Sequence, residues 1–154
     1  DLTEFCDVFY IGGTKVGAMM GEAIIITTDE LKPSFRHMIK QNGGLLAKGR
    51  FLGIQFETLF EDDLYMEIAH HAIDCADRIV GALQEHGYEL AYPSPTNQIF
   101  PILTQKQIDV LKKKYVFQIW EKLDDDRSSI RLCTSWATKK ENVDQLIEDL
   151  KQIK

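Results

Sequence analysis

The chain has 154 residues, of which 44% are hydrophobic and 27% are charged, and its formal net charge is -6. This composition is typical of a globular chain with a real core and argues against disorder. The acidic balance argues against a general nucleic-acid binder, because phosphate binding needs a cationic surface. No apolar run approaches the roughly 18 residues of a membrane span, and the first residues lack a signal-peptide pattern.

The cysteines indicate a reducing compartment, and the first residues indicate that the chain belongs to a longer protein. Cys6, Cys75 and Cys133 are odd in number and widely spaced, which predicts reduced, buried thiols in a cytoplasmic protein. The chain starts without methionine on a short helical stretch directly before a strand-like run. We therefore expect a segment of a longer protein.

Two β-prone runs, residues 7–11 and 21–28, flank a glycine-rich turn. Three consecutive isoleucines at 24–26 predict a strand buried on both faces of a helix-covered sheet. Thr27 and Glu30 have capping-box spacing, which predicts a helix from about residue 29 or 31 to the glycines at 43 and 44. Further helices are predicted over residues 45–60 and 63–85.

The remainder alternates short strands with two helices. Strand-like runs cover residues 88–92, 97–103, 116–120 and 129–136. Helices are predicted over 105–114 and 139–153, with capping boxes at Thr104–Gln107 and Thr138–Glu141. Residues 124–127 (DDDR) read as a charged hairpin connection, and Phe100, Trp120 and Trp136 are expected in the core.

These elements predict an α/β chain in three parts. Residues 1–62 are interpreted as the C-terminal part of an α/β domain whose other strands are missing. Residues 63–87 are a connecting helix, and residues 88–154 are a small α+β C-terminal domain.

The turn GGTKVGAMMGEA, residues 12–23, carries Lys15 among four glycines. A P-loop needs its lysine directly after a glycine and before Ser or Thr, but Lys15 precedes Val16. The G-x-G-x-x-G spacing also fails, so both nucleotide motifs are excluded. Two interpretations remain: an ordinary turn with a solvated lysine, or a turn that presents a neutral amine to a carbonyl such as that of pyridoxal phosphate.

Three stretches of the chain carry a family resemblance. They are DVFYIGGTKVGAMMGEAIII from residue 7, IKQNGGLLAKGRFLGIQFETLF from residue 39 and SSIRLCTSWAT from residue 128. In this order they resemble the threonine aldolase and β-eliminating lyase family, across nearly the whole chain and closest to its low-specificity L-threonine aldolase-like branch. The aromatic-amino-acid lyases usually carry a basic residue where this chain has Val16. The resemblance implies the pyridoxal-phosphate-dependent transferase-like fold (fold type I), with residues 1–62 ending its large domain.

The resemblance also implies roles for single residues. Lys15 would be the catalytic lysine that holds pyridoxal 5'-phosphate as a Schiff base. Thr14 would lie near the cofactor phosphate, although a turn hydroxyl can also bond its own backbone. Arg131 would bind the substrate α-carboxylate; an edge-strand arginine that reaches solvent is the alternative. Arg36 and Lys40, about one turn apart, would face the cofactor phosphate or form a solvated basic surface.

No metal site is predicted. His71 and Cys75 have i, i+4 spacing, which supplies too few ligands without further partners. His70 and His71 point about 100° apart on a helix and cannot both bind one metal ion. We interpret these histidines as surface or interface residues.

The resemblance implies a lyase that cleaves the Cα–Cβ bond of β-hydroxy amino acids, such as L-threonine to glycine and acetaldehyde. β-Elimination is an alternative within the same cofactor class, and a non-catalytic α+β assembly domain is an alternative outside it. The implied partners are an amino acid substrate, further copies in a homodimer or homotetramer, and a preceding large-domain segment, without which we expect no activity.

Overall fold

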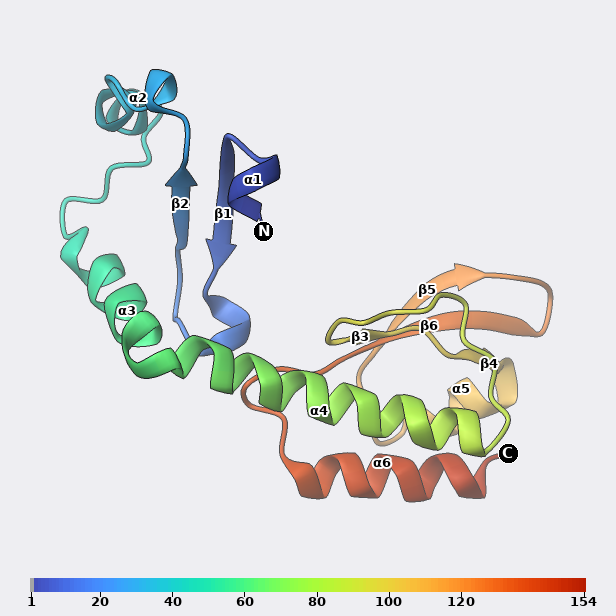
Figure 1. The fold of residues 1–154 in the computed structure, drawn as a ribbon. Helices are drawn as coiled ribbons and strands as arrows, with labels where there is room; N and C mark the ends of the chain where they lie inside the picture. Colours follow the sequence, from blue (N-terminus) through green and yellow to red (C-terminus); the bar gives the residue numbers. More distant parts are fainter. Residues whose placement is uncertain (1) are drawn as a thin grey trace. The chain divides into compact units, whose positions relative to one another are not determined.

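The computed structural model describes residues 2–154 and divides the chain into two compact units, Asp1–Glu67 (unit 1) and Ile68–Lys154 (unit 2). Figure 1 shows the course of the chain. Each unit is described by itself below. The sequence-based division at residues 62/63 and 87/88 stays a prediction.

Unit 1 begins with a helix and a two-stranded sheet. Its first elements are α1 (Leu2–Phe5), β1 (Val8–Gly12), η1 (Thr14–Val16) and β2 (Glu22–Ile26). β1 and β2 pair antiparallel, with Val8 opposite Ile26 and Gly12 opposite Glu22. Ile24 is 51% exposed. The prediction that β2 is buried on both faces is therefore wrong, because alternate side chains of this ribbon point to its two sides and one side is open.

Helices follow β2. They are η2 (Asp29–Leu31), α2 (Phe35–Gln41), α3 (Arg50–Phe60), η3 (Glu61–Asp63) and α4 (Leu64–Glu85). The helix expected from residue 29 or 31 is interrupted, because Ser34 has a φ of 61° before α2 begins. Its expected capping box is absent: the Thr27 hydroxyl instead donates to the carbonyl oxygen of Cys6 at 2.8 Å.

Unit 2 contains a four-stranded antiparallel sheet. Its remaining elements are β3 (Gln98–Ile99), β4 (Ile102–Thr104), α5 (Gln105–Leu111), β5 (Gln118–Lys122), β6 (Arg127–Cys133) and α6 (Lys140–Gln152). β6 pairs with each of β3, β4 and β5. The predicted strand at 88–92 is reduced to an isolated bridge between Leu90 and Pro101.

One face of this sheet is covered by helices. In Figure 1, α4 and α6 run along the same side of the strands, and a hydrogen-bonded ion pair joins Arg78 of α4 to Asp144 of α6. The core between them consists mainly of aliphatic side chains. It includes Cys75, Ala76, Ile79, Leu83, Ile99, Leu103, Ile108, Leu111, Ile130, Val143, Leu146 and Leu150.

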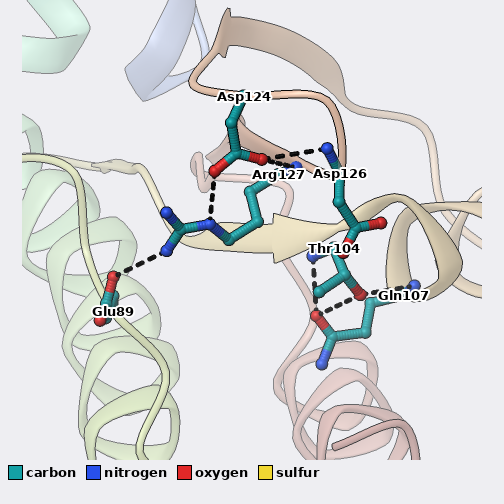
Figure 2. Close-up of polar contacts among 6 residues, drawn as sticks. All are labelled: Glu89, Thr104, Gln107, Asp124, Asp126 and Arg127. Carbon is teal, nitrogen blue, oxygen red and sulfur yellow. Dashed lines mark hydrogen bonds and ion pairs between the residues drawn. The ribbon is translucent and has the colours of Figure 1, made fainter.

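The β5–β6 connection is held by polar contacts. Figure 2 shows Asp124 accepting hydrogen bonds from the backbone N–H of Asp126 at 3.0 Å and from the Arg127 Nε at 2.8 Å. The hydrogen bond from the Arg127 side chain lowers the pKa of Asp124. Arg127 also forms an ion pair with Glu89, with 3.8 Å between Arg127 Nη1 and Glu89 Oε2. The hairpin predicted at residues 124–127 is confirmed, and it fixes the register of β6.

The capping boxes have different outcomes. The Thr104–Gln107 box is present at the start of α5, as Figure 2 shows, with the Thr104 backbone N–H donating to Gln107 Oε1 at 2.9 Å. The Thr138–Glu141 box is absent, because Lys139 is the N-cap of α6 and the Thr138 hydroxyl accepts from the Ser135 N–H.

Several side chains expected in the interior lie at the surface. Trp120 and Trp136 are 48% and 52% exposed, so the prediction that they form the core is wrong. Cys75 is buried, but Cys133 is exposed and Cys6 is intermediate; all of them are free thiols. Across residues 2–154, no helix has the length and apolar character needed to cross a membrane.

Candidate functional site

Lys15 lies in a tight turn directly after β1. The carbonyl oxygen of Gly13 accepts hydrogen bonds from the N–H groups of Val16 at 3.1 Å and Ala18 at 2.9 Å. Gly17 closes this turn with a φ of 101°, which is strained for residues with a side chain. The backbone around Lys15 is therefore fixed by local hydrogen bonds rather than free.

The inner side of the turn is closely packed. Gly13, Val16 and Ala18 are buried. A Cβ on Gly13 would lie 2.6 Å from the Cβ of Ala18, closer than real Cβ atoms approach other atoms, and 3.0 Å from the Cζ of Phe56, which is a tight contact. Phe56 is itself buried on α3. Glycine is needed at position 13 mainly because Ala18 of the same turn comes this close, and Phe56 of α3 adds a second tight contact.

Two more contacts hold the turn. The Tyr65 hydroxyl donates a hydrogen bond of 2.9 Å to the carbonyl oxygen of Gly12. The N–H of Met19 donates to Gln55 Oε1 at 2.7 Å. These contacts connect both sides of the turn to α3 and α4.

The outer side of the turn carries the candidate functional groups. Thr14 and Lys15 are exposed. Within residues 2–154, neither the Thr14 hydroxyl nor the Lys15 Nζ has a hydrogen bond, and Lys15 has no ion pair. These two predicted site residues are neighbours in the sequence, and the structure leaves both polar groups exposed on the same turn.

Arg36 and Lys40 lie one helical turn apart on α2 and are exposed. No hydrogen bond or ion pair in the described part of the chain joins them to Lys15. Either reading of these residues, phosphate contact or solvated basic face, stays open.

Arg131 lies on β6 in unit 2 and is partly buried. Its guanidinium donates to Gln98 Oε1 at 3.3 Å and to Gln118 Oε1, and its Cζ lies 5.1 Å from the ring centroid of Trp120. No carboxylate pairs with Arg131 among residues 2–154. The partners of the guanidinium among the described residues are neutral side chains, so none of them pairs with its positive charge.

The sequence interpretation missed the residues that support these groups. Tyr65 is 53 residues from Gly12 in the sequence, and no local pattern connects them. The signal for Gln98 and Gln118 was present: each is a polar residue inside an apolar strand run, as Arg131 is. Trp120 was assigned to the core on its type alone.

The described residues hold no group of three or more His, Cys, Asp or Glu side chains that could bind a metal ion. His71 Nε2 lies 2.8 Å from the carbonyl oxygen of Thr138 and 3.9 Å from the Cys75 Sγ. The first contact joins α4 to the segment before α6, and the second lies within α4.

Comparison with solved structures defines the class of fold. The chain superposes on a threonine aldolase of Leishmania major with a TM-score of 0.95 and 45% identity, over 98% of this chain and 44% of that chain. It also superposes on a serine palmitoyltransferase of Sphingomonas wittichii with a TM-score of 0.65 and 14% identity, over 96% of this chain and 39% of that one. The chain has the α/β fold of the fold type I enzymes, matched over a partial segment.

The sequence relatives agree with this class. Low-specificity L-threonine aldolases of a Pseudomonas species and of Pseudomonas aeruginosa are 30% and 32% identical to the chain over 152 residues. No family model matches the chain. The matched region covers 96% of this chain but only 42% of each relative, so the chain spans about two fifths of their length. It is a homologue of the low-specificity L-threonine aldolases, which confirms the resemblance seen in the sequence.

Proposed function

We propose that this chain supplies the catalytic lysine and the carboxylate-binding arginine of a pyridoxal-phosphate-dependent lyase. The proposed reaction cleaves the Cα–Cβ bond of β-hydroxy amino acids, converting L-threonine to glycine and acetaldehyde. The observation that carries the proposal is the turn at Lys15, where a closely packed inner side presents an unpaired amine. The similarity to threonine aldolases supports it.

The residues around Lys15 fit such a cofactor. When bound, pyridoxal phosphate supplies a carbonyl for an amine and an electron sink for the bond that breaks. Lys15 Nζ is the proposed point of covalent attachment, and it has no protein partner to displace within residues 2–154. Because Gly13, Val16 and Ala18 fix the backbone on either side, the Cα of Lys15 has one defined position from which its side chain extends.

Thr14 and the basic residues of α2 are proposed phosphate contacts. The Thr14 hydroxyl is exposed next to Lys15 and can donate to a phosphate oxygen. Arg36 and Lys40 add positive charge on α2, which favours an anion. Their assignment rests on the family resemblance.

Arg131 is the proposed anchor for the substrate carboxylate. A guanidinium binds a carboxylate through two parallel hydrogen bonds, which sets orientation as well as affinity. Its present partners are two glutamine oxygens, so the incoming carboxylate would neutralise its charge. A fixed carboxylate limits rotation about Cα and thereby selects which bond is aligned for cleavage.

We further propose that activity requires more polypeptide than these residues. The chain covers 42% of its curated relatives, and the family resemblance implies a preceding large-domain segment that would complete the cofactor site. Assembly as a homodimer or homotetramer in the cytoplasm belongs to the same proposal.

The test combines trapping and product analysis on the whole protein. Borohydride reduction after addition of pyridoxal phosphate should leave a label on the Lys15 peptide. Lys15→Ala should abolish both label and threonine cleavage, whereas Lys48→Ala, which changes another exposed lysine of unit 1, should abolish neither. A label absent from Lys15 would favour the assembly-domain alternative. A 2-oxo acid and ammonia, in place of glycine and acetaldehyde, would favour β-elimination.

A further inference from the structure

Arg131 lies on the face of the sheet opposite to the core of unit 2. Its neighbour Ile130 is fully buried in that core. Because successive side chains of a strand point to opposite faces, Arg131 points away from α4 and α6. Register places Gln118 of β5 opposite Arg131. The guanidinium of Arg131, the amide of Gln118 and the indole of Trp120 thus share the open face.

The partners of Arg131 hold it without neutralising it. Gln98 and Gln118 each accept one hydrogen bond from the guanidinium, which has five N–H donors. Three donors therefore remain. A carboxylate in place of either glutamine would hold Arg131 as firmly, but it would also cancel the charge that attracts an acidic ligand.

The Trp120 ring is itself braced. Its centroid lies 5.3 Å from that of Phe100, and the Phe100 centroid lies 5.6 Å from that of Tyr92 in an edge-on arrangement. The Tyr92 hydroxyl donates to Glu121 Oε2 at 2.6 Å, next to Trp120 on β5. The indole is 48% exposed, yet it packs against Phe100, which is in turn packed against Tyr92.

We propose that Trp120, Gln98 and Gln118 are positioning residues that preset the Arg131 guanidinium for the substrate carboxylate. This inference rests on the proposed function, and we call the three residues the arginine clamp. Trp120 holds the guanidinium by a cation–π contact, and the glutamines fix its rotation while leaving the charge unpaired. Ordering a mobile arginine on substrate binding costs conformational entropy. Because the clamp already orders Arg131, this cost is smaller when the carboxylate binds.

Kinetics of the holoenzyme separate positioning from mere structural support. Trp120→Leu should raise KM for L-threonine about three- to tenfold, because a contact of this kind typically contributes a factor of that order. Trp120→Phe keeps an aromatic face and should stay within about twofold of the parent. A structural role alone would lower kcat through a smaller active fraction and leave KM unchanged.

The glutamine position offers a matched pair of variants. Gln118→Ala removes one acceptor, whereas Gln118→Glu adds a negative charge that competes for Arg131. We expect Gln118→Glu to raise KM about tenfold more than Gln118→Ala does. Equal KM values for the two variants would overturn the clamp.

Tryptophan fluorescence can report ligand binding at the clamp without catalytic turnover. Trp136→Phe leaves Trp120 as the single tryptophan of these 154 residues. The same holoenzyme with Trp120→Phe added gives the emission of any tryptophan elsewhere, which is subtracted. Glycine added to this holoenzyme should change Trp120 emission saturably, and glycinamide, which lacks the carboxylate, should not. The same change with both ligands, or with neither, would overturn the inference. If borohydride reduction left no label on Lys15, that result would instead overturn the proposed function, and the role of the clamp would fall with it.

Discussion

The hydroxyl of Tyr65, in the first turn of α4, donates a hydrogen bond of 2.9 Å to the carbonyl oxygen of Gly12, the last residue of β1. This bond crosses 53 residues of sequence and fixes the backbone two peptide groups before Thr14. The Lys15 turn is therefore held by tertiary structure as well as by its own hydrogen bonds. Replacing Tyr65 by phenylalanine removes this hydrogen bond by deleting only the hydroxyl oxygen.

Tyr65→Phe should loosen the Lys15 turn while leaving the ring packing unchanged. Loss of one intramolecular hydrogen bond typically costs about 1 kcal/mol. We expect faster hydrogen exchange at the N–H groups of Val16 and Ala18, which bond to Gly13 within this turn. Tyr10→Phe removes a hydroxyl from an exposed ring and serves as control. Equal protection in both variants would contradict the anchoring role of Tyr65.

Gly13→Ala and Gly12→Ala form a matched pair in adjacent positions. The new Cβ at position 13 would meet Ala18 at 2.6 Å, whereas the one at position 12 would have nothing within 4 Å. Overpacking of this kind costs about 1–3 kcal/mol. Gly13→Ala should lower the denaturation midpoint of unit 1 and the yield of label trapped on Lys15. Gly12→Ala should change both only slightly.

Asp149 should make unit 2 sensitive to acid. Hydrogen bonds from Lys114 and then Tyr115 lower the pKa of this buried carboxyl from 3.8. A lowered pKa contributes stability that is present above the unfolded-state value and is lost as pH falls through the folded-state value. The urea midpoint, followed by tryptophan emission, should fall below about pH 4. In Asp149→Asn this fall should be much smaller.

Tyr115 should titrate at unusually high pH. Burial, together with its hydrogen bond to Asp149 and the charge of that carboxylate, raises the pKa of Tyr115 to about 12. A raised pKa contributes stability below the unfolded-state value of about 10, which is lost as pH rises towards 12. The phenolate absorbance step near pH 12 should disappear in Tyr115→Phe. It should move to lower pH in Asp149→Asn, and an unchanged step in both variants would assign it to another tyrosine.

The sequence predicted helices better than the details of their ends. Thr104, Thr27 and Thr138 all have capping-box spacing, but only Thr104 forms the box. Thr27 and Thr138 make other hydrogen bonds, with Cys6 and Ser135. A short hydroxyl side chain has several backbone partners within reach, and the tertiary fold decides which one it takes.

Burial was the least predictable property. The isoleucines of β2 and the indole of Trp120 were assigned to the interior by residue type, yet Ile24 and Trp120 are about half exposed. For Trp120 the reason is local: its ring covers Arg131 on the face away from the core. Motif order predicted the fold and the relatives, whereas the roles of Lys15 and Arg131 stay predictions until labelling and kinetics test them.

The unequal interiors of the two units bear on how the chain is degraded. In unit 1 the buried hydrophobic side chains among the described residues are Val16, Ala18, Phe56 and Leu59, whereas unit 2 has a continuous aliphatic core. Unit 1 should open at a lower free energy. Its exposed basic residues from Arg36 to Arg50 would then be the first that trypsin reaches. The surviving piece would keep Arg131 and lose Lys15, so a single cut would separate the amine from the proposed carboxylate anchor.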